Sequence, residues 1–140
     1  MRYLLDTSAL IHLQRNHPAL AARVASLPAT AQLYASVIAQ GELLYGALRA
    51  PARRRTTLAA EAGRLLADLA DVLPVTTAVA DRYARIKAQL AAQGTPIPAN
   101  DIWVAAIALE AGLILVSDDA HFQNVPDLTV ENWLTLPNSA

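Results

Sequence analysis

Two short, almost wholly apolar runs that each end near a carboxylate constrain this chain more than any other feature. The first run, Tyr3-Leu4-Leu5, is followed directly by Asp6. The second run, Leu113–Val116, is followed by Ser117 and then by Asp118-Asp119. Short apolar runs bounded by polar residues are typical of buried strands. If these two strands are parallel neighbours, their carboxylates emerge at the same edge of the sheet, where open α/β folds bind ligands.

The rest of the chain alternates between helix and strand patterns. Pro74 favours an edge position for its strand, and Gly94 and Gly112 are expected to end the helices before them. The patterns predict helices over 9–15, 18–27, 36–49, 52–69, 77–93 and 100–111, further strands over 32–35, 72–75 and 128–131, and a helical turn near His121-Phe122. This alternation predicts a single α/β domain over residues 1–140, with a mostly parallel central sheet flanked by helices on both faces.

Composition narrows the functional classes. The chain has 140 residues, a formal net charge of −1 and no cysteine, so it has no disulfide framework and no thiolate metal site. No apolar stretch approaches the ~20 residues that a membrane span requires, and the N-terminus lacks a secretory pattern. We therefore expect a cytoplasmic protein without a membrane partner. Arg49 and Arg53 to Arg55 crowd one connection, which is either a solvated surface or a site for phosphates or an acidic partner.

Asp6 has two interpretations when it is considered alone. Asp, Ser and Thr are favoured N-cap residues, so Asp6 could simply cap the helix that follows it. It could equally be a functional carboxylate at the end of a buried strand. The second acid at the end of the Leu113–Val116 strand favours a functional role, because a helix cap has no need of another carboxylate nearby. Thr7 and Ser8 are then expected to cap the helix.

Two further acids lie in otherwise apolar helices. Asp101 is the only charge in the stretch Asp101–Leu109, and an acid in a first turn is also favoured by the helix dipole. The neighbouring Asn100 could cap this helix instead. Glu42 lies at helical spacing between Ile38 and Tyr45, so it is either on a solvated face or held by a partner. The flanking Gly41 and Gly46 are unfavourable inside a helix and suggest that another backbone approaches closely.

Asp6, Glu42, Asp101 and Asp119, if brought together, would repel one another unless a cation compensates them. Oxygen ligands suit a hard divalent ion, so the expected cofactor is Mg²⁺ or Mn²⁺. Zinc is not expected, because cysteine is absent and the histidines lack ligand spacing. We therefore predict that all three histidines are surface or packing residues, namely His12, His17 and His121.

Four segments, taken in order, resemble the motifs of PIN domains, and specifically of PIN-domain toxins of the VapC type. The resemblance spans nearly the whole chain. Asp6, Glu42, Asp101 and Asp119 stand at the acidic positions of the four motifs, and the spacing to Phe122 favours Asp119 over Asp118. The segments are Asp6-Thr7-Ser8-Ala9-Leu10, Ser36-Val37-Ile38 through Gly41–Gly46, Asn100–Ala106 and Ser117–Phe122.

This resemblance implies a metal-dependent endoribonuclease that is paired with a small antitoxin and forms a homodimer. Asp6 and Asp101 would be the principal metal ligands, and Glu42 and Asp119 would complete the site directly or through water. Ser8 and Ser117 would lie in or beside the coordination sphere. Two alternatives remain at this point: a PIN nuclease of housekeeping RNA processing without an antitoxin, and an inactive PIN module that acts as an interaction scaffold.

Overall fold

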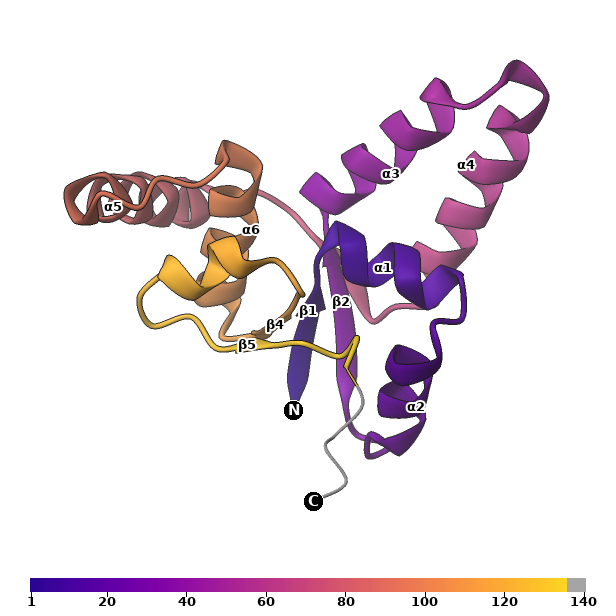
Figure 1. Ribbon diagram of the computed structural model, residues 1–140, viewed down its shortest axis with the longest axis horizontal. Helices are drawn as coiled ribbons and strands as arrows, with labels where there is room; N and C mark the ends of the chain where they lie inside the picture. The colour runs from indigo at the N-terminus through magenta and orange to yellow at the C-terminus, as the bar shows by residue number, and fades with distance from the viewer. Residues whose placement is uncertain (136–140) are drawn as a thin grey trace.

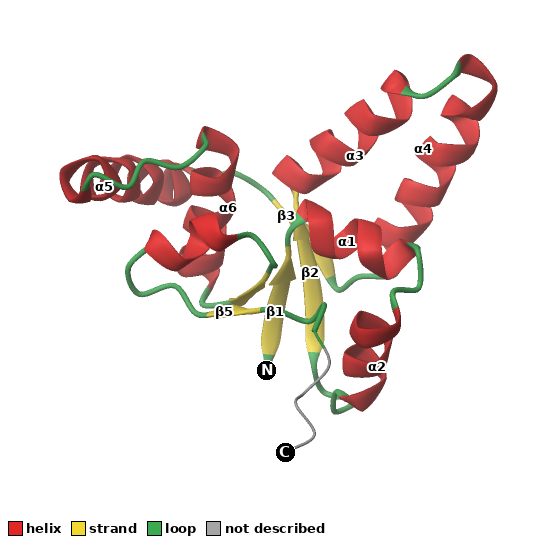
Figure 2. Ribbon diagram, viewed as in Figure 1, coloured by secondary structure: helices red, strands yellow, loops and turns green. Residues whose placement is uncertain are grey.

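The computed structural model describes residues 1–135 and is built around a parallel sheet (Figure 2). The strand order is β3-β2-β1-β4-β5, and every pair of neighbouring strands is parallel. The strands are β1 (Arg2–Leu5), β2 (Gln32–Ser36), β3 (Asp71–Leu73), β4 (Ile114–Val116) and β5 (Val130–Glu131). The prediction of a mostly parallel sheet is confirmed. The last five residues of the predicted domain, 136–140, lie outside the described residues.

Helices cover both faces of this sheet, as predicted (Figure 1). One side carries α5 and α6, and the other carries α1 to α4, with α3 and α4 forming an antiparallel pair. The helices are α1 (Thr7–Gln14), α2 (Pro18–Ser26), α3 (Val37–Arg49), α4 (Ala52–Ala67), α5 (Thr77–Gln93), α6 (Ala99–Ala111) and the 3-10 helix η1 (Ala120–Asn124).

The core divides into two clusters because successive side chains of a strand point to opposite faces. Leu4 in β1 and Leu115 in β4 pack with α5 and α6. Tyr3 and Leu5 in β1 and Val116 in β4 pack with the helices of the opposite side. Strands β1 and β4 are buried on both faces, as expected for the centre of a parallel sheet. The sheet is therefore a rigid platform whose C-terminal edge positions whatever follows β1 and β4.

The N-caps of α5 and α6 differ from the predictions, whereas the C-terminal ends of these helices agree with them. Gly94 and Gly112 end α5 and α6 in the left-handed conformation, with φ of 73° and 67°, as predicted. The N-cap of α5, however, is Thr76 and not Thr77, because Thr76 is extended and its hydroxyl accepts a hydrogen bond from the Val79 amide at 3.2 Å. The N-cap of α6 is Pro98, without a side-chain cap hydrogen bond, so Asn100 lies inside the helix and does not cap it.

The two glycines of α3 do not serve the purpose that the sequence suggested. Among the residues that the structure describes, a Cβ atom added to Gly41 or to Gly46 would meet no neighbouring atom within 4 Å. The prediction that another backbone approaches them closely is therefore wrong. Both residues are exposed. They leave open surface on either side of Glu42, although glycine in a helix interior costs about 0.5–1 kcal/mol relative to alanine.

The chain after β5 is held by an aromatic contact. Trp133 is only 3% exposed, and its ring meets that of Tyr3 edge-on with centroids 4.9 Å apart. Its indole Nε1 donates a hydrogen bond to Glu131 Oε1 at 2.9 Å. Glu131 also pairs with Arg23 of α2 at 3.2 Å, so the last described segment is tied across the sheet to the N-terminal half. Over residues 1–135, no helix combines the length and apolarity needed to cross a membrane.

Candidate active site

Asp6 lies at the junction between β1 and α1, and it caps the helix itself. Its Oδ1 accepts a hydrogen bond from the Ala9 amide at 2.8 Å, the arrangement expected of an N-cap carboxylate. The prediction that Thr7 and Ser8 take over this capping is wrong, because both are within the first turn of α1. Asp6 is only 7% exposed. Its position is therefore fixed by the end of a buried strand and by the first turn of a helix.

The loop after β4 brings further acids beside Asp6. Leu5 pairs with Val116, and the Asp6 amide donates to the Val116 carbonyl at 3.1 Å. The expectation that these two strands are parallel neighbours is thus confirmed. The hydroxyl of the buried Ser117 accepts from the Asp119 amide at 3.0 Å and so orders the turn that carries Asp119.

The two acids of the doublet after β4 have different surroundings. Asp118 is exposed, and its Oδ1 accepts a hydrogen bond from the Ser8 hydroxyl at 3.3 Å. Asp119 is half-buried and lies beside Asp6 in the wall of a small cavity. Of the two acids, Asp119 is the one that lines this cavity, and its role as a site residue stays a prediction.

Glu42 and Asp101 reach the same place from two helices. Glu42 is exposed on α3, and its Oε1 accepts a hydrogen bond from Thr7 Oγ1 at 3.0 Å. This bond joins α3 to the start of α1. Asp101 lies in the first turn of α6, whose following residues are almost all buried, so the helix has little freedom to move its first turn. Both carboxylates are held at the C-terminal edge of the sheet.

All four predicted acids line one cavity of about 150 Å³. They arrive from four places in the chain: the end of β1, the middle of α3, the start of α6 and the loop after β4. Its walls are formed by Asp6, Thr7, Ser8, Glu42, Asp101, Val104, Asp119 and Phe122. The cavity is therefore rich in carboxylate and hydroxyl oxygens, with Val104 and Phe122 as the apolar part of its wall.

The cavity disfavours negative charge on its two most enclosed acids. Burial raises the pKa of Asp6 from 3.8 to about 6. Hydrogen bonds from Ser117 and the Ala9 amide lower this pKa, whereas the charges of Asp118 and Asp119 raise it further. Burial likewise raises the pKa of Asp101, against the effect of its hydrogen bond to His121. A bound cation would oppose these effects by favouring the charged carboxylates.

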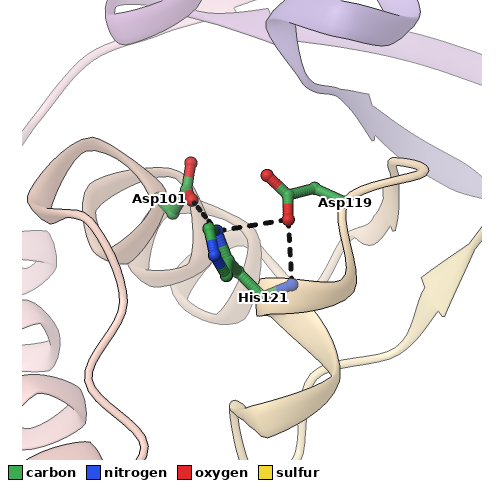
Figure 3. A group of neighbouring side chains, drawn as sticks. All are labelled: Asp101, Asp119 and His121. Carbon is green, nitrogen blue, oxygen red and sulfur yellow. Dashed lines mark hydrogen bonds and ion pairs between the residues drawn. The ribbon is translucent and has the colours of Figure 1, made fainter.

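His121 is the site residue that the sequence did not reveal. Its Nδ1 lies 3.1 Å from Asp101 Oδ2 and 3.2 Å from Asp119 Oδ1, so the imidazole bridges two of the acids (Figure 3). His121 is exposed at the surface, as predicted, but the sequence did not indicate that its ring would contact two of the acids. The turn of η1 produces this contact, since the Asp119 carboxylate caps the His121 amide at 2.9 Å. The sequence feature that could have indicated this contact is the spacing of Asp119 and His121, which are two positions apart.

The other two histidines, His12 and His17, are packing residues, as predicted. Their rings meet edge-on with centroids 5.2 Å apart, and His17 Nδ1 accepts a hydrogen bond from the Leu20 amide at the start of α2. The ligand atoms of Asp101, Asp119 and His121, by contrast, all lie within 4.8 Å of one another. These three residues could hold a metal ion, and the remaining carboxylates of the cavity lie beside them.

A larger groove borders the acidic cavity and lies between α1, α3 and α4. Its volume is about 420 Å³, and Glu42 belongs to the walls of both hollows. Apolar residues form much of the groove, with two arginines and two glutamates among them. The lining comprises Ile11, Gln14, Arg15, Glu42, Leu43, Gly46, Ala47, Arg54, Leu58, Glu61 and Ala62. Of the crowded arginines, Arg54 contributes to this groove.

Comparison with known proteins identifies the family of this chain. The family model described as "PIN domain" matches residues 3–128. Ribonuclease VapC1 of Haemophilus influenzae (strain R2866) is 33% identical, over 95% of this chain and 98% of that protein. The tRNA(fMet)-specific endonuclease VapC of Salmonella typhimurium is 30% identical, over 95% of this chain and 98% of its own length.

The fold is also similar to that of solved structures of this family. A chain in the structure of VapBC-1 from nontypeable Haemophilus influenzae superimposes with a TM-score of 0.86 at 30% identity, covering 96% of this chain and 100% of that one. The match includes the segments that carry all four acids of the cavity, which lie within residues 3–128. The chain therefore belongs to the PIN-domain family, and within that family it is of the VapC type.

Proposed function

We propose that this protein is a divalent-metal-dependent endoribonuclease that acts as the toxin of a type II toxin–antitoxin pair. The observation that carries the proposal is the convergence of Asp6, Glu42, Asp101 and Asp119 around one cavity at the sheet edge. So many carboxylates in a small space are unfavourable unless a cation is bound. The names of the relatives, which describe ribonucleases, support RNA as the substrate.

The proposed ligands are Asp6 and Asp101, with Glu42 and Asp119 completing the site directly or through water. Mg²⁺ or Mn²⁺ suits this oxygen-rich set. When bound, such an ion supplies Lewis-acid stabilisation of phosphate charge and lowers the pKa of a coordinated water. The protein residues hold the geometry: Ser117 and the Ala9 amide fix the Asp6 carboxylate.

Two hydrogen bonds to neighbouring elements keep the other acids in place. Thr7 holds Glu42 against the start of α1, and His121 spans Asp101 and Asp119. In the proposed mechanism these contacts orient the carboxylates, so that the scissile phosphate meets a pre-formed site. Removing an orienting partner is expected to weaken metal binding or activity without removing a ligand.

The proposed protein partner is an antitoxin segment seated in the groove between α1, α3 and α4. An amphipathic segment could place apolar side chains against Leu43 and Leu58 and a basic one towards Glu42, a recognised mode of groove binding. The solved neighbour of 30% identity is a VapBC structure, which supports a partner of this class. We further propose that the protein forms a homodimer and works in the cytoplasm.

The test of the proposed activity is cleavage of a long single-stranded phage RNA with and without Mg²⁺. We expect Asp6→Asn and Asp101→Asn each to abolish metal-dependent cleavage while circular dichroism shows the native fold. Asp81→Asn is the matched control, because Asp81 is an exposed carboxylate on α5 whose one ion pair within residues 1–135 is with Arg85. Cleavage by a clean Asp6→Asn preparation at the wild-type rate would show that the ligand assignment is wrong.

A further inference from the structure

A third hollow lies between α3 and the start of α6, next to the acidic cavity. Its volume is about 340 Å³, near the lower end of the ~300–1,000 Å³ typical of small-molecule sites. Its lining is Val37, Ile38, Gly41, Glu42, Tyr45 and Asn100. Glu42 is shared with the acidic cavity, and Asn100 precedes Asp101 in the chain. The hollow, which we call the α3–α6 groove, therefore adjoins the proposed catalytic centre.

Gly41 keeps this groove open. A Cβ at this position would touch nothing within 4 Å, and the residue has an ordinary helical conformation, so neither packing nor backbone geometry requires glycine. Alanine would be the more stable residue in an exposed helix interior. The absence of a side chain has one clear structural effect, which is to leave open the part of the groove wall that Gly41 forms beside Glu42 and Tyr45.

Tyr45 provides an aromatic surface at the edge of the groove. The residue is 62% exposed, an unusual position for a large aromatic side chain of a folded domain. The guanidinium of Arg49 lies over its ring, 5.4 Å from the centroid. An exposed aromatic ring with an arginine beside it is the combination with which proteins stack a nucleobase and contact the adjoining phosphate. Tyr45 and Arg49 are one helical turn apart, so α3 presents them together.

The remaining lining of the groove suits a base and not a charged group. Val37 and Ile38 offer apolar contact, and the exposed Asn100 offers an amide that can both donate and accept hydrogen bonds. Glu42 is the only acid in the lining. The neighbouring acidic cavity repels phosphate in the absence of a cation, whereas the groove has apolar residues, one aromatic ring, one amide and a nearby arginine.

From this juxtaposition we propose that the α3–α6 groove binds one nucleobase of the RNA, next to the scissile phosphate, with the base stacked on Tyr45. The proposal rests on the proposed ribonuclease function and deepens it by naming a specificity-determining site. The exposed ring of Tyr45 with Arg49 beside it favours an RNA base over a protein side chain, and the shared Glu42 places that base next to the carboxylates.

The experiment begins by mapping a cut in the long phage RNA. A short synthetic RNA spanning that cut is then compared with versions that lack the base at one flanking nucleotide each. For wild type, removing the base that occupies the groove should reduce kcat/KM about 5-fold to 100-fold, the range expected for one stacked base. Tyr45→Ala should show the same loss on the intact RNA and no additional loss on that one abasic RNA.

Two further variants separate stacking from other effects. Tyr45→Phe keeps the ring and should retain wild-type kcat/KM, while Gly41→Leu fills the groove and should reproduce the Tyr45→Ala loss. Leu48→Ala is the matched control: Leu48 is 65% exposed one turn along α3 and does not line the groove, so its kcat/KM should be unchanged. Circular dichroism of each variant establishes that the helix is intact.

Three results would overturn the proposal, and they are distinguishable. If the wild type cleaves no RNA in the presence of Mg²⁺, both the proposed ribonuclease function and the proposed base site are wrong. If the wild type cleaves efficiently but Tyr45→Ala lowers kcat/KM by the same factor on every abasic RNA, the proposed base site alone is wrong. A Tyr45→Ala loss that is the same on all RNAs and accompanies a change from dimer to monomer in sedimentation would assign the groove to a second copy of the chain.

Discussion

Replacing Asp6 by Asn should make the metal-free protein more stable while it removes activity. Burial raises the pKa of this carboxyl from 3.8 to about 6, so at neutral pH the folded protein holds a charge that its surroundings disfavour. A shift of the pKa between these two values means that burying the charged carboxylate lowers the free energy of unfolding by roughly 3 kcal/mol at neutral pH. Asn can still cap α1, but it loses the charge-assisted hydrogen bonds, so we expect a net gain of about 1–2 kcal/mol.

The pH dependence of this gain has a definite sign. Because the pKa of Asp6 is higher in the folded state, protonation of Asp6 stabilises the wild type. This contribution to the free energy of unfolding is fully present below pH 3.8 and is lost as the pH rises through about 6. Wild type and Asp6→Asn should therefore be similarly stable near the lower value. The variant should become progressively more stable than wild type across this interval, and the difference should be constant above it.

The assay is urea unfolding in the presence of a chelator, at neutral pH and near pH 3.8, followed by circular dichroism. At neutral pH the variant should also melt roughly 3–8 °C higher. Asp81→Asn serves as the control, since this exposed acid makes only a surface ion pair and its loss should change stability by less than about 0.5 kcal/mol. An Asp6→Asn protein that is no more stable than wild type at neutral pH, or equally more stable at both pH values, would refute the reasoning.

Three other predictions follow from single contacts. Gly46→Ala should stabilise the protein by about 0.5–1 kcal/mol in urea unfolding, because the added Cβ has open space around it. Gly94→Ala should destabilise it by about 1 kcal/mol, because the φ of Gly94 is 73°. Equal effects of the two substitutions would contradict this prediction. Trp133→Ala should cost about 3–5 kcal/mol, since the indole is buried against Tyr3, and a change below 1 kcal/mol would show that the contact is unimportant. His121→Ala should weaken Mn²⁺ binding about 10-fold to 100-fold in calorimetry, and unchanged affinity would exclude an orienting role.

The sequence predicted the sheet well because its signals are local and strong. Tyr3-Leu4-Leu5 and Leu113–Val116 are apolar on both faces, which only a central parallel strand accommodates. The adjacency of those strands explains why Asp6 and Asp119 meet. The approach of Glu42 and Asp101 depends on how α3 and α6 pack, which no periodicity specifies, and it was inferred through the family resemblance.

Other features could not be read from the sequence because they depend on details of a turn. His121 reaches two acids only because η1 is a tight 3-10 turn capped by Asp119. Asp6 was expected to be either a cap or a functional acid, yet the geometry of the β1–α1 junction allows its carboxylate to cap the helix and also to face the cavity. Glycine at position 41 does not distinguish an open groove from a close backbone contact, because both exclude a side chain there.

The most direct test of the proposed metal centre is a titration of Mn²⁺ into the metal-free protein, followed by electron paramagnetic resonance of the free ion. Wild type and Asp81→Asn should remove Mn²⁺ from solution with the same affinity, and Asp101→Asn should bind it at least about 10-fold more weakly. Equal binding by Asp101→Asn and wild type, or no binding by wild type, would contradict the claim that these four carboxylates form a metal site.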